Sequence, residues 1–456
     1  GEYTITLTVL DAYGNINTAT QTITVADPNI VFAGTKTICF SNTEDFTGAP
    51  VDATKITTSD YTAAINGQID ANTTDKRLMF KGGDTFVVGT STANKTSIKR
   101  IQICSFGTGK ANIAILPGIA ATNLLNTKDS AGNPVNDIQI YDLKASRPPG
   151  NAPTTFYGGS AHKTSINNVT NPNGRITLYN IECVRMFLGG MSGRGNAVVG
   201  CTGGDGYDNT YQGGGNNMYS TNISMSMFAG NIFDNNVSGE HCFRMQGYSK
   251  IYVESNTLLN PSNTKHCMAI RGSSLVTNVT DWAANTTFDE TFSVIPLADR
   301  FKLFMRTALS GASPVQTDAT EPDWSTAIDF GDTVTDGGYI WMLVGKRTSE
   351  DYAFAYPSDY ANIQNNWFGV PNPRADYVCT LMVQIACGSP NQNNEPEYDL
   401  LFEGNHFAPN LSFSGGSQTA LELQVVRGTV RNNTMSVPAV IDARDKLQRF
   451  FLAVAG

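Results

Sequence analysis

Residues 240–247 read EHCFRMQG and residues 265–272 read KHCMAIRG, so nearly the same phrase returns after 25 residues. Each copy begins with a charged residue, a histidine and a cysteine, and each ends with a polar residue and a glycine. A short unit that returns at a fixed period of roughly 20–50 residues is typical of a solenoid, in which stacked units share one core. The phrase therefore predicts two stacked repeats.

A second recurring pattern supports stacked repeats along most of the chain. An apolar strand, an Asn or Asp at a turn and another apolar step follow one another in FAGNIFDNN, IYVESNTLLNP and LLFEGNHFAPN. Asn231 and Asn256 are 25 residues apart, and Asn405 and Asn433 are 28 apart. Asn tolerates the left-handed backbone of a tight turn and can hydrogen-bond to its copy in the next repeat. The pattern predicts an all-β fold, a parallel β-helix (solenoid) over residues 29–277 and 347–456.

The stretches KRLMFKGGDTFVV and IKRIQICSFGTGKANIAI resemble the entry coils of right-handed parallel β-helix proteins of the pectate-lyase-like kind. The resemblance implies a right-handed helix.

The composition and net charge of the chain limit the partners and the locations that it can have. Only 16% of the 456 residues are charged, the net charge is −9 and the sequence pI is about 5.0. Such a chain lacks the basic field that nucleic acids require. No apolar run approaches the ~20 residues of a membrane span. Nine Asn-x-Ser/Thr sequons suit a glycoprotein at an extracellular, cell-surface or virion-surface location.

The sequence pattern of residues 1–28 predicts a β-hairpin. Tyr3, Ile5, Leu7 and Val9 alternate with threonines before the turn phrase DAYGN. The stretch resembles the last two strands of a PKD-type immunoglobulin-like module. The chain opens inside a strand, so we expect a piece of a longer protein. A lone hairpin is marginal in water, so we expect its apolar face to be covered by the body, by upstream residues or by another subunit.

The repeat rhythm is lost over residues 278–346, which we predict to be a small β module inserted between two repeats. Trp282, Trp324, Trp341 and the phrase DGGYIW fall on a pattern that resembles a small module of phage tail and other surface proteins.

Aligning the two copies of the opening phrase predicts three adjacent pairs: His241 with His266, Cys242 with Cys267, and Gln246 with Arg271. One interpretation is structural: a satisfied ladder of histidines with buried thiols. The other is functional, because ionisable groups are concentrated here in a chain that is otherwise poor in them. A cation that neutralises a uronate carboxylate and a base near neutrality are what a polysaccharide lyase requires.

The same segment is similar to β-helices of the alginate- and chondroitin-lyase type, with Glu240 and Arg271 on that family's motif. Cys242 and Gln246 depart from it, at the places of a calcium ligand and of a lysine base. We therefore predict no metal site and no cofactor, although that family can use calcium. The phrase GGDGYDN resembles the acidic step of pectin hydrolases, but its companion motifs are missing.

The candidate catalytic residues are His241, His266, Arg244 and Arg271. The candidate substrate-binding residues are Glu240, Lys265, Gln246, Tyr207 and Asp208, the last two from the preceding repeat.

Two functions remain open from the sequence. The first is an extracellular, carbohydrate-associated protein, with polysaccharide as its partner, that acts as a lyase or hydrolase on a surface glycan. The alternative is a non-catalytic structural surface protein: a filament or sheath subunit, an adhesin or a phage tail component. It would self-assemble by strand addition through its N-terminal hairpin and the apolar C-terminal stretch RFFLAVAG.

Overall fold

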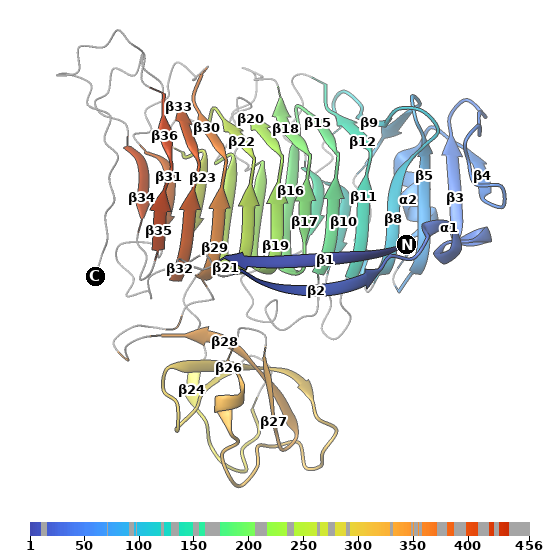
Figure 1. Cartoon of the computed structure of the whole chain (residues 1–456). Coiled ribbons are helices and arrows are strands. Elements are labelled where there is room, and N and C mark those ends of the chain that lie inside the picture. The colour runs from blue at the N-terminus through green and yellow to red at the C-terminus, as the bar shows by residue number, and fades with distance from the viewer. Residues whose placement is uncertain are drawn as a thin grey trace, which may run out of the picture.

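A computed structural model shows a protein that is nearly all β, with long parallel sheets (Figure 1). The described residues are 1–10, 16–70, 72–90, 95–96, 98–119, 123–128, 136–148, 155–159, 174–205, 217–234, 241–261, 265–271, 279–288, 292–328, 332–347, 350, 354, 358–371, 381–386, 398–408, 419–423 and 428–436. Two short α-helices, α1 (Pro28–Val31) and α2 (Tyr61–Gln68), lie among them, near the N-terminal end of the sheets.

The parallel strands fall into three sets. The strands β19 (Met218–Ala229) and β21 (Phe243–Glu254) span two of the sets, because the first half of each pairs with one set and the second half with the other. The first set further contains β7 (Lys95–Thr96), β10 (Asn123–Lys128), β13 (Thr155–Gly159), β16 (Phe187–Arg194), β23 (Met268–Arg271), β31 (Leu381–Ala386) and β34 (Thr419–Leu423). The last residue of β16, Arg194, also pairs with Gly174 of the second set.

The second set further contains β3 (Thr37–Ser41), β4 (Thr54–Thr57), β5 (Thr74–Lys81), β8 (Lys99–Phe106), β11 (Asn136–Tyr141), β14 (Gly174–Tyr179), β17 (Ala197–Val199), β29 (Ser358–Gln364), β32 (Tyr398–Glu403) and β35 (Gly428–Arg431). The third set is a separate sheet of β6 (Thr85–Val88), β9 (Ala111–Ile115), β12 (Leu143–Ser146), β15 (Glu182–Val184), β18 (Thr202–Asp205), β20 (Ile232–Asp234), β22 (Thr257–Leu259), β30 (Trp367–Gly369), β33 (His406–Ala408) and β36 (Thr434–Met435).

Along most of the chain, strands of the three sets follow one another in turn. Each strand then pairs in parallel with the equivalent strand of the next repeat, as β20 does with β22 and β22 with β30. The all-β class and the long parallel sheets agree with the sequence analysis, and they are compatible with a β-helix-like fold.

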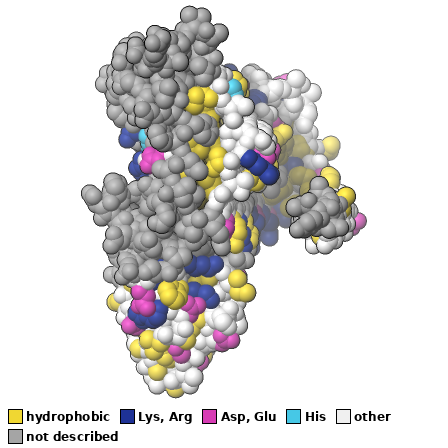
Figure 2. Space-filling view, turned by 60° about the vertical axis from the view of Figure 1, so that its left-hand side comes forward, with side chains coloured by type: hydrophobic (Ala, Val, Ile, Leu, Met, Phe, Trp, Pro, Cys, Tyr) yellow, Lys and Arg dark blue, Asp and Glu magenta, His cyan; other side chains and the backbone are white. Residues whose placement is uncertain are grey.

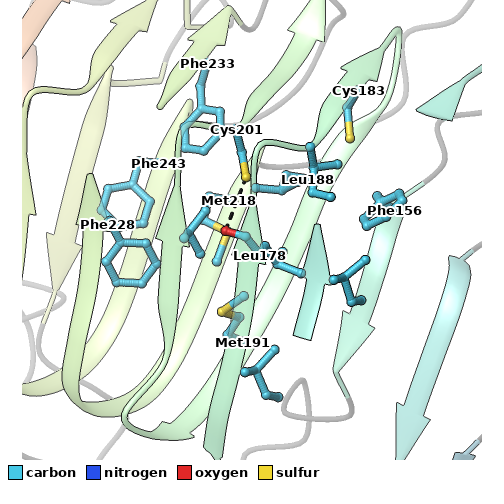
Figure 3. Close-up of a cluster of buried hydrophobic side chains, with 14 of the residues drawn as sticks. Phe156, Leu178, Cys183, Leu188, Met191, Cys201, Met218, Phe228, Phe233 and Phe243 are labelled. Carbon is cyan, nitrogen blue, oxygen red and sulfur yellow. Dashed lines mark hydrogen bonds between the residues drawn. The ribbon is translucent and has the colours of Figure 1, made fainter. Parts of the chain in front are cut away.

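Alternating side chains of these strands form the main core. In β21, Phe243 and Met245 are buried, while Arg244 and Gln246, which alternate with them, are half-buried and face outward. Figure 3 shows how side chains from several repeats meet inside, with the Cys201 thiol donating to the Leu178 carbonyl at 3.5 Å. Each large apolar side chain buried in this way contributes about 1.5–3 kcal/mol to folding.

A ladder of asparagines joins the repeats at the turn between the second and third sets. It contains Asn231, Asn256, Asn366, Asn405 and Asn433. The Nδ2 of Asn256 donates to the Phe228 carbonyl at 2.9 Å and to Asn366 Oδ1 at 2.9 Å, and its own Oδ1 accepts from the backbone and side chain of Asn231. The stacking expected from the sequence is therefore present.

The left-handed backbone of this turn belongs to the residue before each ladder asparagine. Ser255 and Asn365 adopt φ of 55° and 54°, and Gly230 and Gly404 fill the same place in other repeats. The sequence analysis assigned the left-handed conformation to the ladder asparagine itself. In the structure, one residue adopts the left-handed backbone and the next residue makes the ladder hydrogen bonds, because the ladder side chain must point inward to reach its neighbours.

Asn256→Ala should lower the free energy of unfolding by at least about 2 kcal/mol, because it leaves several buried polar groups without their hydrogen bonds. Urea denaturation followed by circular dichroism measures this. The control is Asn112→Ala, a half-buried asparagine of β9 outside the ladder, which donates to Thr85 Oγ1 at 3.4 Å and accepts from Ser146 Oγ at 3.0 Å; its loss should cost about 1 kcal/mol. Equal losses in the two variants would contradict the importance of the ladder.

The N-terminal strands β1 (Glu2–Leu10) and β2 (Ile16–Thr24) form their own antiparallel two-stranded sheet. Register pairs Tyr3 with Ile23 and Leu10 with Ile16, as expected for a hairpin. The described side chains of both strands are exposed. On the apolar face of this hairpin, the described side chains of Tyr3, Ile5 and Ile23 therefore stay exposed to solvent.

The segment that breaks the repeat rhythm forms a separate five-stranded sheet (Figure 1). Its strands are β24 (Val279–Asp281), β25 (Ser293–Ile295), β26 (Lys302–Leu309), β27 (Thr333–Asp336) and β28 (Tyr339–Lys346). The fully buried Asp336 carboxylate accepts from the indole N–H groups of Trp282 at 2.8 Å and Trp341 at 3.0 Å. One carboxylate thus ties together two of the aromatic side chains noted in the sequence.

This module interrupts a single repeat rather than separating two repeats. Arg271, which ends β23, pairs with Gln246, and Ser358, which begins β29, pairs with Tyr248. In β21 only Gly247 lies between these two positions. The insertion therefore occupies the place of one residue, and the strands on either side keep the register of an uninterrupted repeat.

Replacement of residues 272–357 by a single glycine should leave the parallel sheets folded, because it recreates the connection found in β21. A cooperative thermal transition monitored by circular dichroism is the expected result. Bridging with alanine instead should be less stable by about 1–2 kcal/mol, since Gly247 adopts a φ of 68°. A non-cooperative transition in the glycine-bridged chain would show that the module is needed for the sheets.

Candidate functional site

The two histidine-containing phrases lie on neighbouring strands of the first set. Phe243 pairs with Met268 and Gln246 with Arg271, which is the alignment expected from the sequence. The rings of His241 and His266 are 5.0 Å apart between centroids, and the backbone N–H of His266 donates to His241 Nδ1 at 3.0 Å. The 25-residue period therefore brings both histidines into direct contact.

The two histidines differ in their environment. His241 is only 1% exposed, and desolvation lowers its pKa to about 2; the neighbouring His266 and the positive charges of Arg244, Arg271 and Lys265 lower the pKa further. His241 is therefore a neutral acceptor inside the protein across the physiological range. His266 is half-buried, so it is the ring of this pair that reaches the surface.

The cysteines of the two phrases are buried free thiols. Cys242 Sγ donates to the Leu259 carbonyl at 2.9 Å, and Cys267 Sγ donates to the Gly369 carbonyl at 3.6 Å. They pack as small apolar side chains with a local hydrogen bond. The buried-thiol interpretation of the sequence is confirmed for this pair.

Outward from the histidines, a group of planar polar side chains crosses five strands of the first set. We call this group the polar strip; its members are Tyr219, Arg244, Gln246, Arg271, Gln384 and Glu422. The strands that carry it are β19, β21, β23, β31 and β34, and neighbouring parallel strands are ~4.8 Å apart, so the strip extends for about 20 Å.

The members of the polar strip hold one another in place. Arg271 donates through Nε and Nη2 to Gln384 Oε1 at 3.0 and 2.8 Å, and Gln384 Nε2 donates to Glu422 Oε2 at 3.2 Å. At the other end the guanidinium of Arg244 lies 5.3 Å from the ring centroid of Tyr219, whose hydroxyl donates to Gln246 Oε1. A guanidinium held in this way is oriented before any ligand arrives.

The structure brings together only part of the residue set expected from the sequence. His241, His266, Arg244, Gln246 and Arg271 meet on β21 and β23 or immediately before them, and Lys265 precedes His266. Glu240, Tyr207 and Asp208 lie outside the described residues. Figure 2 shows basic, acidic and histidine side chains close together at one margin of the molecule.

Gln384 and Glu422 have no counterpart in the sequence analysis. Gln384 pairs with Ala269, although 115 residues separate them in the chain. The inserted module lies between these strands in the sequence and hides their period. The sequence did contain a signal for these two residues. Apolar and other residues alternate in LMVQIA and TALEL, so Gln384 and Glu422 fall on the outward face once β31 and β34 are aligned with β23.

Within the described residues, no group of three or more His, Cys, Asp or Glu side chains could hold a metal ion. None of the helices in that part of the chain is both long and apolar enough to cross a lipid bilayer. Comparison with known proteins found no matching family model and no matching curated protein.

The buried state of His241 predicts a pH dependence of stability. Its pKa of about 2 in the folded protein lies below the ordinary value of 6.5, so the unfolded state binds a proton first as the pH falls. The stability associated with the neutral ring is complete above pH 6.5 and is lost below it by about 1.4 kcal/mol per pH unit.

The variant His241→Asn keeps an acceptor for the His266 N–H but does not titrate in this range. Its unfolding free energy, measured by urea denaturation from pH 7.5 to 5.0, should fall less steeply than that of the wild type. Parallel curves for the two proteins would mean that His241 does not titrate differently on folding.

Proposed function

We propose that this chain is an extracellular, carbohydrate-associated protein whose parallel sheets form a right-handed β-helix and whose polar strip binds an acidic polysaccharide. The observation that carries the proposal is the strip itself: two guanidinium groups, two amides, a tyrosine ring and one carboxylate, which accepts a hydrogen bond from Gln384, at the regular spacing of stacked repeats. Long, extended polymers match such a surface, because each repeat can offer one set of contacts to successive sugar units.

Charge favours an acidic polymer over a neutral one. Arg244, Arg271 and Lys265 all lie close enough to His241 to lower its pKa, so the positive field is concentrated at this part of the strip. Guanidinium groups bind carboxylates and sulfates through paired, charge-assisted hydrogen bonds. Gln384 supports this function because it fixes the orientation of the Arg271 fork.

Among reactions on such a polymer, β-elimination suits the strip better than hydrolysis. Elimination needs a cation to stabilise charge on the substrate carboxylate and a base to take the neighbouring proton. In this proposal Arg271 supplies the first and the half-buried His266 supplies the second. The ring takes the proton from the carbon beside the carboxylate, a C=C bond forms to the next carbon as its C–O bond breaks, and the leaving oxygen takes a proton from water. Hydrolysis needs two carboxyl groups across the scissile bond, whereas the strip contains one carboxylate, Glu422, which accepts a hydrogen bond from Gln384.

A non-catalytic surface role uses the same strip without the chemical step. In that case the strip serves adhesion to an acidic glycan, and the protein binds the polymer without cleaving it. Release of unsaturated uronate, measured by its ultraviolet absorbance, separates the two cases. His266→Gln should abolish this release and leave polymer binding in place if elimination occurs.

Arg244→Gln and Arg271→Gln should each weaken binding of an acidic polysaccharide roughly 10- to 100-fold, the effect of losing one charge-assisted hydrogen bond. Isothermal titration calorimetry against a panel of polyuronates, sulfated glycans and neutral glycans measures this. The control is Arg175→Gln, which removes an arginine of the second set that pairs with Asp137. Binding should also weaken as salt concentration rises.

The proposed function fails if no acidic glycan in the panel binds, or if Arg175→Gln weakens binding as much as the strip variants do. Thermal melting of each variant checks that the loss of binding does not come from unfolding.

A further inference from the structure

We propose that two copies of this chain exchange their N-terminal hairpins, so that the apolar face of each β1–β2 hairpin packs on the outer face of the second strand set of the other copy. This interface is separate from the polar strip and does not depend on the proposed polysaccharide binding. The occupant of the surface is a second copy of the same chain.

The first component is the apolar face of the hairpin. Tyr3, Ile5, Ile23 and Val25 alternate with threonines and lie on one face, and their exposed fractions range from 41% to 58%. The hairpin extends to Val25, whose N–H donates to the Gly1 carbonyl at 2.7 Å. An isolated two-stranded sheet is marginally stable in water, so a cover for this face would stabilise it.

The second component is an apolar area on the outer face of the second set, which we call the methionine patch. Its members are Tyr179, Val199, Met225, Met227 and Ala229. Register aligns Tyr179, Val199 and Ala229 on β14, β17 and β19, and Met227 lies on the same face of β19. Met225 comes two residues earlier, where its φ of 46° marks the passage of β19 from the first set to the second. Tyr179, Met225 and Met227 are between 38% and 50% exposed.

The methionine patch is local to these repeats. In the earlier strands β8 and β11, the residues equivalent to Met227 are the glutamines Gln102 and Gln139. Gln102 Nε2 donates to Gln139 Oε1 at 2.7 Å, so this position is polar there. A flat apolar area beside polar neighbours is typical of an interaction surface. Two sheet faces of this kind pack at ~10 Å from each other, as in a β-sandwich.

In the single chain the hairpin and the methionine patch do not cover each other, since Ile5 and Met227 remain 55% and 38% exposed. The connection after the hairpin is anchored to the body. The Asp27 side chain accepts from the Asn29 N–H at 2.8 Å and Pro28 fixes the backbone at the start of α1. Asn29 in turn accepts from Arg77 Nη2 at 3.0 Å. Only a short stretch separates this anchored segment from β2, so the direction of the hairpin is set at its base.

The buried area favours reciprocal exchange over a single contact. Nine residues in each of two strands give a hairpin face of roughly 300 Å². One hairpin on one patch therefore buries about 600 Å² in total, which is in the range of crystal-packing contacts, whereas two reciprocal contacts bury about 1,200 Å², the lower limit of stable interfaces. The area thus predicts a closed, two-fold dimer rather than a head-to-tail filament.

Disulfide trapping tests which surfaces meet. Two single variants, Ile5→Cys and Met227→Cys, are purified separately, mixed and oxidised; the six cysteines in the described part of the chain are all buried. We expect a covalent dimer in the mixture, at least tenfold more than in a mixture of Thr4→Cys with Met227→Cys, because Thr4 lies on the opposite face of β1. Equal yields would overturn the proposal.

Light scattering measures the assembly of the unmodified chain, which should have twice the 49.0 kDa mass of one copy. Ile5→Asp and Met227→Glu should each give monomers with an unchanged melting transition of the parallel sheets. A wild-type monomer, or an intrachain disulfide in the double variant Ile5→Cys/Met227→Cys at high dilution, would overturn the exchange. Large polymers would support a head-to-tail contact instead and would equally contradict it.

Discussion

The hydrogen bonding of each repeat to the next is the constraint on which the rest of this structure depends. Parallel strands repeat at a fixed lateral distance, so any side chain that recurs with the period meets its own copy. The asparagine ladder uses this directly, because Asn256 accepts from Asn231 and donates to Asn366. A buried amide that bonds to its own kind on both sides resists any slip in register.

The same constraint explains why one pair of phrases contains both a structural and a candidate functional element. Alternation along β21 sends Phe243 and Met245 inward and Arg244 and Gln246 outward. Chemistry and scaffold thus share β21, and they differ in which side of it they occupy. The two histidines do not follow this alternation: they precede β21 and β23 and stack on each other, with His241 buried and His266 half-buried.

Periodic features were predictable from the sequence and interrupted ones were not. The 25-residue period correctly pairs Gln246 with Arg271, because no residue is added or lost between the two copies. Gln384 and Glu422 could not be placed in the same way, because the inserted module breaks the count. The left-handed residue before each ladder asparagine was also missed, since Ser255 and Gly230 share no chemistry that a pattern could reveal.

The position of the module has a consequence for how the chain folds. Asn256 and Asn366 are 110 residues apart in sequence, yet they must meet before the ladder can continue. Contacts between distant residues slow folding, because the closure of a long loop costs entropy before any contact offsets it. The module has its own sheet and its own core, so it can form as a unit and bring the end of β23 close to the start of β29. Once it has formed, the chain still to be closed consists of residues 272–278 and 347–357, which connect its sheet to β23 and β29. The closure entropy that the insertion adds within its repeat is therefore set by these two connections and not by the full length of the inserted sequence.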